Sequence, residues 1–187
     1  MKEKLFTLTY PWDGNGYKPK VEYILSMDED GFCMHMTIYE SNPRRIETEH
    51  QRDIYMDSCA EWFVNFAPEI CDRYFNFEVN ANGAMHVAFR KDRYEGTMLT
   101  VEDIAVLDIQ AKVSEDKWQV YYHVPFALIK KYIPNYYFEK GMTIRTNFYK
   151  CGDGTKFPHF GIWKEYPLLK PDFHRPEYFG EIKLFEK

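Results

Sequence analysis

The chain has 187 residues, of which 45% are hydrophobic and 28% charged, and these values are typical of a single globular domain spanning residues 1–187. The net charge of −5 argues against a nucleic-acid partner, because neutralising phosphates needs a basic patch and the sequence offers only the pair Lys130-Lys131. No apolar run reaches the length of a membrane span, so we expect no membrane partner.

In chain order, residues 4–10 alternate weakly and predict an edge strand. Residues 21–27 and 32–39 predict a hairpin across the turn Asp28-Glu29-Asp30-Gly31. The two aspartates fail the EF-hand calcium pattern, so we interpret this stretch as a plain turn. Residues 40–53 predict a long loop, and residues 55–66 a strand whose Trp62 packs in the core.

Residues 74–80 alternate with Phe75, Phe77 and Val79 inward, and Asn82-Gly83 predicts a type I′ turn into a paired strand over residues 85–89. Residues 104–113 and 117–124 predict another hairpin, in which Trp118 packs inward. Residues 126–132 predict one short helix, which Pro125 opens at its first position. A strand over residues 142–151 follows, and residues 157–163 lead into the closing segment.

The closing segment carries Pro171 and Pro176, which predict an extended chain over residues 171–180 and exclude a helix there. A strand-like run, residues 181–185, follows it. About ten short strands and one short helix predict an all-β fold, an antiparallel β-sandwich with immunoglobulin-like or DOMON-like layers. We expect the closing segment to complete this sandwich and to line one rim of its binding face.

Four cysteines, at positions 33, 59, 71 and 151, show no C-x-x-C spacing and predict free thiols, with one disulfide if the protein is exported. The first residues include an acidic side chain and no apolar segment, which does not indicate a signal peptide. We therefore expect a cytoplasmic protein, or a secreted or periplasmic one if a leader has been removed.

Several strands place polar side chains on a face that a half-buried sheet turns to water. Amides, tyrosines and arginines dominate this set rather than Lys and Glu, and these groups pair well with the neighbouring hydroxyls of a sugar. Composition alone leaves a binding face and a solvated face equally open. The set comprises Glu61, Asn65, Tyr74, Asn76, Glu78, Gln119, Tyr121, His123, Arg145, Asn147 and Tyr149.

Six stretches, in this order, resemble the core of the family 9 carbohydrate-binding modules: residues 57–63, 74–83, 118–126 and 145–150, Trp163, and residues 172–180. The resemblance implies a DOMON-like β-sandwich that binds a saccharide ligand without cleaving it, in the use of polysaccharides such as xylan. Modules of this kind clamp a terminal sugar between two aromatic rings and often hold structural calcium. We expect a monomer or weak dimer, binding in the micromolar range or more weakly.

The resemblance suggests Trp163 as the first stacking ring, and Trp12, Tyr39 or Tyr55 as the second. The hydrogen-bonding candidates around the sugar are Arg90, Arg145, Asn147, His174 and Glu78. The metal ligands stay undefined at this stage.

Two rival functions stay open. A glycosidase needs two carboxylates about 5–10 Å apart, and the candidates are Glu61, Glu78, Asp172 and Glu177. Asp57-Ser58 together with His174 could form a catalytic triad, although the sequence contains no nucleophile-elbow motif. A haem or metal site is suggested by Met34, His35, Met36 and His86, although no C-x-x-C-H motif is present.

Overall fold

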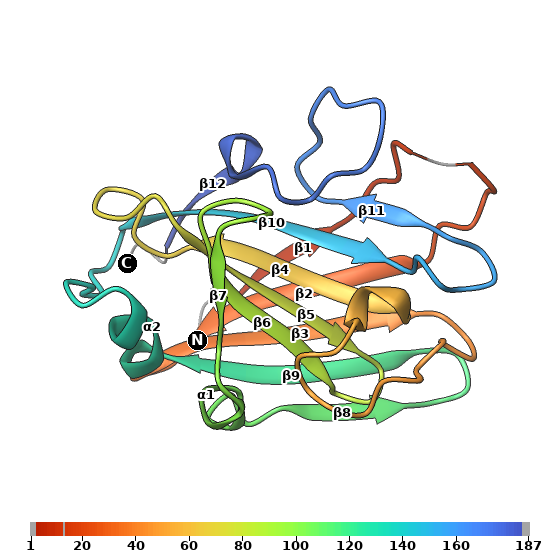
Figure 1. The fold of residues 1–187 in the computed structure, drawn as a ribbon, viewed down its shortest axis with the longest axis horizontal. Helices are drawn as coiled ribbons and strands as arrows, with labels where there is room; N and C mark the ends of the chain where they lie inside the picture. The colour runs from red at the N-terminus through yellow and green to blue at the C-terminus, as the bar shows by residue number, and fades with distance from the viewer. Residues whose placement is uncertain (1–2, 13, 185–187) are drawn as a thin grey trace.

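The computed structural model describes residues 3–12 and 14–184. Within them the chain forms two antiparallel β-sheets packed face to face, with most of the short helical segments near the edges (Figure 1). The predicted all-β sandwich is confirmed.

The smaller sheet has five strands in the order β1-β2-β3-β9-β8, and each neighbouring pair is antiparallel. The edge position of β1 and the β2–β3 hairpin agree with the sequence expectation. The strands are β1 (Lys4–Thr7), β2 (Lys20–Met27), β3 (Gly31–Tyr39), β9 (Trp118–Pro125) and β8 (Gln110–Val113).

The larger sheet has seven strands in the order β11-β10-β4-β5-β6-β7, with β12 also paired to β10. The long strand β10 pairs with β4 along one edge, and with β12 and β11 in turn along the other. The strands are β11 (Phe160–Ile162), β10 (Thr143–Cys151), β4 (Cys59–Asn65), β5 (Tyr74–Asn80), β6 (Met85–Arg90), β7 (Gly96–Met98) and β12 (Gly180–Lys183). The expected Phe185 end of the last strand lies outside the described residues.

The main core fills the space between the two sheets, because alternating strands turn every second side chain inward. Trp62 stacks on Phe77 at 5.5 Å between ring centroids, and its Nε1 donates to Thr146 Oγ1 at 2.8 Å. Trp118 is equally buried and donates to Glu40 Oε2 at 3.1 Å. The prediction that both tryptophans serve packing is confirmed.

A second apolar cluster lies on the outer face of the seven-stranded sheet, where the closing segment folds back over it. Phe173 stacks on Tyr149 with ring centroids 4.2 Å apart, and Phe179 packs edge-on against Tyr74. Of the two alternatives that the sequence left open, a solvated face does not describe this sheet, because most of its outward polar residues, Asn76 and Asn147 among them, are buried.

The remaining members of the polar set, Gln119, Tyr121 and His123, lie on β9 and so belong to the other sheet. The polar residues of the sequence thus divide between the two outer faces of the sandwich and do not make one surface.

Two local predictions are wrong. Residues 104–108 were expected to begin a strand, but α1 (Val101–Ala105) occupies the start of this stretch, and the side chain of Thr100 caps it by accepting from Asp103 N at 3.2 Å. The turn after β5 is not type I′, because that type needs a positive φ at both central residues and here only Gly83 has one, at 80°.

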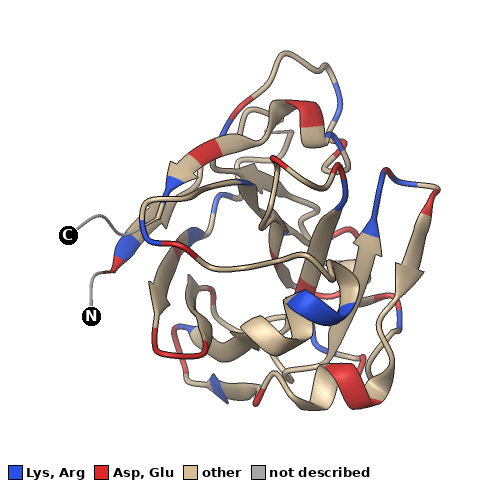
Figure 2. Cartoon of the chain, turned by 90° about the vertical axis from the view of Figure 1, so that its left-hand side faces the viewer, with Lys and Arg blue, Asp and Glu red and all other residues tan. Residues whose placement is uncertain are grey.

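The predicted helix is confirmed as α2 (Phe126–Tyr132), with Pro125 as its N-cap residue rather than its first helical residue. Lys131 of α2 bonds Asp103 of α1 at 2.6 Å, where a blue and a red helical segment lie close together in Figure 2. Short 3-10 turns occupy Ile54–Met56 and Pro176–Tyr178, so the closing segment is extended only as far as Arg175.

All four cysteines are free, as expected. No helix among the described residues has the length and apolar character needed to span a membrane.

Candidate functional site

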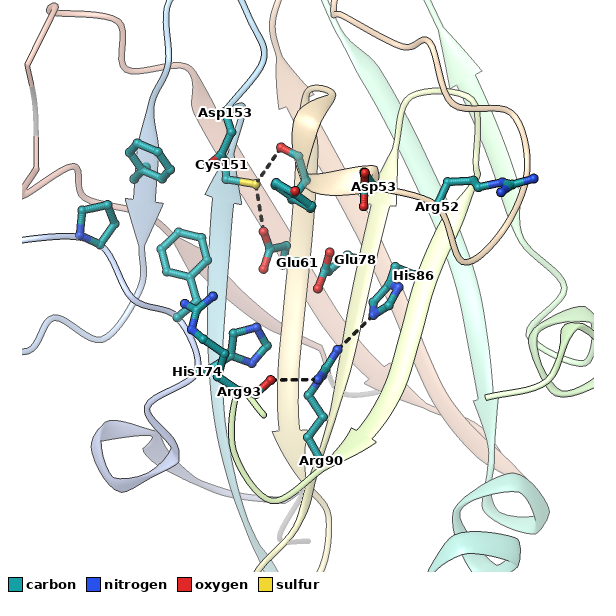
Figure 3. Close-up of a pocket in the computed structure, with 14 residues that line it drawn as sticks. Arg52, Asp53, Glu61, Glu78, His86, Arg90, Arg93, Cys151, Asp153 and His174 are labelled. Carbon is teal, nitrogen blue, oxygen red and sulfur yellow. Dashed lines mark hydrogen bonds between the residues drawn. The ribbon is translucent and has the colours of Figure 1, made fainter. Parts of the chain in front are cut away.

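A cleft of about 430 Å³ opens on the outer face of the seven-stranded sheet (Figure 3). Strands β4, β5, β6 and β10 supply its floor, the loop before β4 supplies one wall and the closing segment supplies another. Its lining residues are Arg52, Asp53, Tyr55, Glu61, Glu78, His86, Arg90, Arg93, Cys151, Asp153, Phe160, Pro171, Phe173 and His174.

Aromatic rings line two sides of the cleft. Tyr55, in the 3-10 turn before β4, is 43% exposed. Phe160 and Phe173 lie toward the other side, and the stack of Phe173 on Tyr149 holds its ring in place. Such rings offer flat apolar faces to the C–H face of a pyranose.

Two carboxyl groups lie side by side on the floor, because Glu61 of β4 faces Glu78 of β5 in the strand register (Figure 3). They are 3% and 7% exposed. Burial raises the pKa of Glu78 to about 7, and burial together with the neighbouring Glu78 raises the pKa of Glu61 well above its usual value. Burial therefore favours the protonated form of Glu61, and in that form the carboxyl can donate a hydrogen bond.

Neighbouring side chains fix the orientation of both carboxyls. Cys151 Sγ donates to Glu61 Oε1 at 2.9 Å, and Asn76 Nδ2 donates to Glu78 Oε1 at 2.7 Å. The floor is thus pre-organised, which lowers the entropy cost of binding a polar ligand.

Arg90 lies beside this pair with its guanidinium held by neutral partners. Its Nε donates to Asn76 Oδ1 at 3.0 Å, Nη1 to Arg93 O at 3.2 Å, and Nη2 lies 3.2 Å from His86 Nε2. Burial, with the charge of Arg90 close by, lowers the pKa of His86 to about 4. The imidazole is therefore neutral and can accept a hydrogen bond from Arg90. Arg90 therefore brings a fixed donor group to the cleft.

His174 belongs to the closing segment, and its Nδ1 lies 2.8 Å from the Tyr74 hydroxyl. Burial, followed by the charges of Arg93 and Arg90, lowers the pKa of His174 to about 3. Arg93 also bonds Asp172 at 2.6 Å, which ties the β6–β7 loop to the same segment. The closing segment therefore does line one rim of the cleft.

The structure brings four of the eight predicted binding residues to the cleft: Arg90, His174, Tyr55 and Glu78. The best single candidate from sequence, Trp163, is not among them. Its ring packs against the core residues Phe6 and Phe148, with centroids 5.0 and 5.6 Å away, so it does not face the cleft.

The other three candidates have structural partners. Asn147 bonds the backbone N–H and carbonyl of Lys164, both at 2.9 Å. Arg145 donates to Glu177 O at 3.2 Å, and Trp12 donates to Leu168 O at 2.9 Å. All three hold the chain that follows β11, and none lines the cleft.

Sequence reasoning missed Phe160, Phe173, Arg93 and Asp153 as lining residues. Phe173 lies between Asp172 and His174, in a stretch that resembles the family. This position could have indicated that Phe173 lines the site. Glu61 was placed on the same face as Glu78 but was not selected as a binding residue. For Arg93 and Asp153 we find no signal in the sequence.

The triad and the haem site that the sequence suggested do not assemble. Both Asp57 carboxylate oxygens already accept hydrogen bonds, including one from Asn80 Nδ2 at 2.8 Å, and Ser58 Oγ donates to Glu40, so no triad forms with His174. His35 points away from the core that contains Met34 and Met36. These residues cannot converge on one haem.

Among the described residues, two clusters offer three metal-ligating side chains each: Asp28, Cys33 and His123, and Cys59, Glu61 and Cys151. Calcium prefers oxygen ligands alone, and both clusters contain sulfur. Neither cluster fits the structural calcium that the resemblance implied.

A β-sandwich with an aromatic-walled, hydrogen-bonding cleft on one outer face defines a small-molecule binding module. The chain belongs to carbohydrate-binding family 9, whose family model matches residues 4–184. No curated protein matched the chain.

Solved structures share this architecture. A Bacteroides uniformis protein with a proposed carbohydrate-binding role superposes with a TM-score of 0.84 at 25% identity, over 97% of this chain and 86% of that one. A family 9 module from Caldicellulosiruptor kristjanssonii, solved with glucose, superposes with a TM-score of 0.65 at 13% identity, over 97% of this chain and 85% of that one. A family 9 module from the same organism, solved with cellotriose, superposes with a TM-score of 0.67 at 13% identity, over 98% of this chain and 83% of that one.

Proposed function

We propose that this chain binds the terminal unit or units of a carbohydrate in the cleft and does not cleave it. The observation that carries the proposal is the combination of an exposed ring, Tyr55, with a fixed Arg90 and the Glu61–Glu78 floor in a family 9 fold. The family 9 modules of similar fold were solved with glucose and cellotriose.

The cleft suits a sugar in size and chemistry. Its volume of about 430 Å³ lies within the range of about 300–1,000 Å³ usual for small-ligand pockets. A pyranose packs its C–H face on an aromatic ring, while its hydroxyls both donate and accept hydrogen bonds. Arg90 donates, Glu78 accepts when ionised, and Glu61 donates when protonated, so the floor can match hydroxyls in either role.

A glycosidase would also need two carboxyl groups, and Glu61 and Glu78 form a pair. They are direct partners on neighbouring strands of one sheet, and this pairing alone does not separate a binding floor from a catalytic pair. The match to a family of carbohydrate-binding modules favours binding without cleavage.

The test is a calorimetric titration with glucose, cellotriose and xylo-oligosaccharides. We expect saturable binding in the micromolar range or weaker, reduced roughly tenfold by Tyr55→Ala because one stacking face is lost. Tyr137→Ala is the matched control, because Tyr137 is 66% exposed and does not line the cleft.

Two results would count against the proposal: flat titrations with every sugar, or equal loss of affinity in the Tyr55 and Tyr137 variants. Release of reducing sugar or of an aryl aglycone, abolished by Glu78→Gln, would instead favour the glycosidase.

A further inference from the structure

A cluster of side chains of mixed chemistry lies on the outer face of the five-stranded sheet, where the sugar-binding proposal gives it no role. Asp28 belongs to the β2–β3 turn, Cys33 to β3 and His123 to β9. Their ligating atoms all lie within 4.8 Å of one another. We call these three residues, together with Asp30 of the same turn, the hairpin cluster.

The strand register builds the cluster. Cys33 and His123 are direct partners in the β3–β9 pairing, so their side chains share the outer face. Asp28 starts the turn, and its Oδ1 accepts the backbone N–H groups of Asp30 at 3.2 Å and Gly31 at 3.0 Å. The carboxylate is therefore held over the pair by the turn itself.

Gly31 lets the imidazole approach the turn. A Cβ at position 31 would lie 2.4 Å from His123 Nε2 and 2.5 Å from the Val124 carbonyl oxygen. These distances are shorter than any van der Waals contact, so any larger residue would displace the ring. The close approach brings His123 within reach of both turn aspartates.

Three contacts within the cluster have nearly the spacing of ligand atoms in a tetrahedral metal site. Cys33 Sγ lies 3.3 Å from Asp28 Oδ2, and His123 Nε2 lies 3.2 Å from Asp28 Oδ1 and 3.5 Å from Asp30 Oδ1. In a tetrahedron with bonds of about 2.0–2.3 Å, the ligand atoms are roughly 3.3–3.8 Å apart. Small side-chain movements would centre one ion among Asp28, Cys33 and His123, and the exposed Asp30 would have to swing toward Cys33 to complete the set.

We propose that Asp28, Cys33 and His123 bind a zinc ion, with Asp30 as the fourth ligand. A thiolate and an imidazole select a borderline-soft ion such as zinc over calcium or magnesium, which take oxygen ligands. On binding, Cys33 releases its thiol proton to solvent and its sulfur bonds the metal.

The surroundings of the cluster provide an outer layer of support. The Tyr121 hydroxyl donates to Cys33 Sγ at 3.4 Å, and this bond persists when the metal replaces the thiol proton. Outer hydrogen bonds of this kind orient ligands and tune affinity. The bound ion would tie the β2–β3 turn to β9 and stabilise that end of the sheet, far from the sugar cleft on the opposite face of the sandwich.

The experiment is a calorimetric titration of the metal-free full-length chain with zinc. We expect one equivalent to bind, with affinity lowered at least tenfold in Cys33→Ser and in His123→Gln, and about tenfold in Tyr121→Phe. Cys71→Ser is the matched control, because this cysteine lies outside both clusters, and it should bind as the wild type does.

A second readout covers variants that fold poorly. Cobalt should give a thiolate-to-metal charge-transfer band and tetrahedral visible bands in the wild type, and the charge-transfer band should vanish in Cys33→Ser. Zinc should also raise the thermal unfolding midpoint of the wild type and not that of His123→Gln.

Absence of zinc binding, or binding that survives Cys33→Ser and His123→Gln unchanged, would overturn the proposal. Loss of zinc binding in Cys151→Ser, with binding intact in Cys33→Ser, would move the site to the cluster at the cleft floor and would overturn it as well.

Discussion

The ring of Trp163 shows how one residue's surroundings decide its role. It lies between Phe6, Phe148 and Gly180, where a Cβ at position 180 would come within 2.8 Å of the indole. We therefore assign Trp163 to packing rather than to sugar stacking.

Trp163→Ala should lower the free energy of unfolding by about 3 kcal/mol, because a ring packed on the core leaves a cavity behind. Affinity for sugar, measured on the folded fraction at low temperature, should change less than about threefold. Urea unfolding and calorimetry check the two parts separately. Loss of sugar binding without loss of stability would return Trp163 to the binding site.

Glu78 gives a prediction on pH. Its folded-state pKa of about 7 lies above the ordinary value of 4.5, so between these values the folded state binds more protons than the unfolded state. This group therefore lowers stability as pH rises through that window. The destabilisation is complete above pH 7, because there the buried carboxyl is ionised.

Glu78→Gln removes this titration and keeps an oxygen that accepts from Asn76. We expect the variant to gain thermal stability relative to wild type as pH rises from 5 to 8. Scanning calorimetry at several pH values measures the difference. If the difference in unfolding temperature between wild type and variant does not change with pH, the assigned environment of Glu78 is contradicted.

At the scale of elements, the closing segment both covers the seven-stranded sheet and forms a wall of the cleft. Phe173 has both tasks, since it stacks on Tyr149 and lines the cleft. The covering of the sheet by the closing segment and the wall of the cleft thus both depend on the packing of Phe173.

Phe173→Ala should cost about 3 kcal/mol of stability and should weaken sugar binding, because the wall loses its anchor. Leu169→Ala, just before this segment and fully exposed, is the control and should change neither property. Hydrogen exchange over residues 164–179 and sugar titration provide the measurements. Equal behaviour of the two variants would show that Phe173 does not hold the segment.

The strands were predictable because alternation is a local property. The inward assignments of Phe75, Phe77 and Val79 are confirmed, and the first helix was missed although Thr100 and Asp103 carried a capping signal. Covering of the outer face was not predictable, because Phe63 and His174, whose ring centroids lie 5.0 Å apart, are separated by a long stretch of chain.

The same limit applies to the candidate site. Strand alternation put Glu78 on the outward face, whereas Arg90 was suggested with the family resemblance. In the structure Arg90 pairs with Tyr74 in the strand register and bonds Asn76, which also bonds Glu78. Asn147 has the right chemistry for a sugar, but its amide bonds the backbone of Lys164, a contact that only the tertiary fold reveals. Residue type and strand face predict which side chains could bind a sugar. They do not predict which of those side chains already have hydrogen-bond partners within the protein.

At the scale of the whole molecule, the two outer faces of the sandwich differ. The seven-stranded sheet carries the cleft and its covering segment, whereas the five-stranded sheet carries the hairpin cluster. Sugar binding and metal binding can therefore be tested independently, because the Cys33, Tyr121 and His123 variants lie outside the cleft and the Tyr55 variant lies outside the hairpin cluster.

The central claim is that sugar binds in the cleft on the seven-stranded sheet. Backbone NMR shifts during titration with cello- and xylo-oligosaccharides test it most directly. The account predicts shifts concentrated at Tyr55, Glu61, Glu78, Arg90 and His174, with Gln119 and Tyr121 unchanged. Shifts concentrated on the five-stranded sheet, or around Trp163 alone, would contradict it.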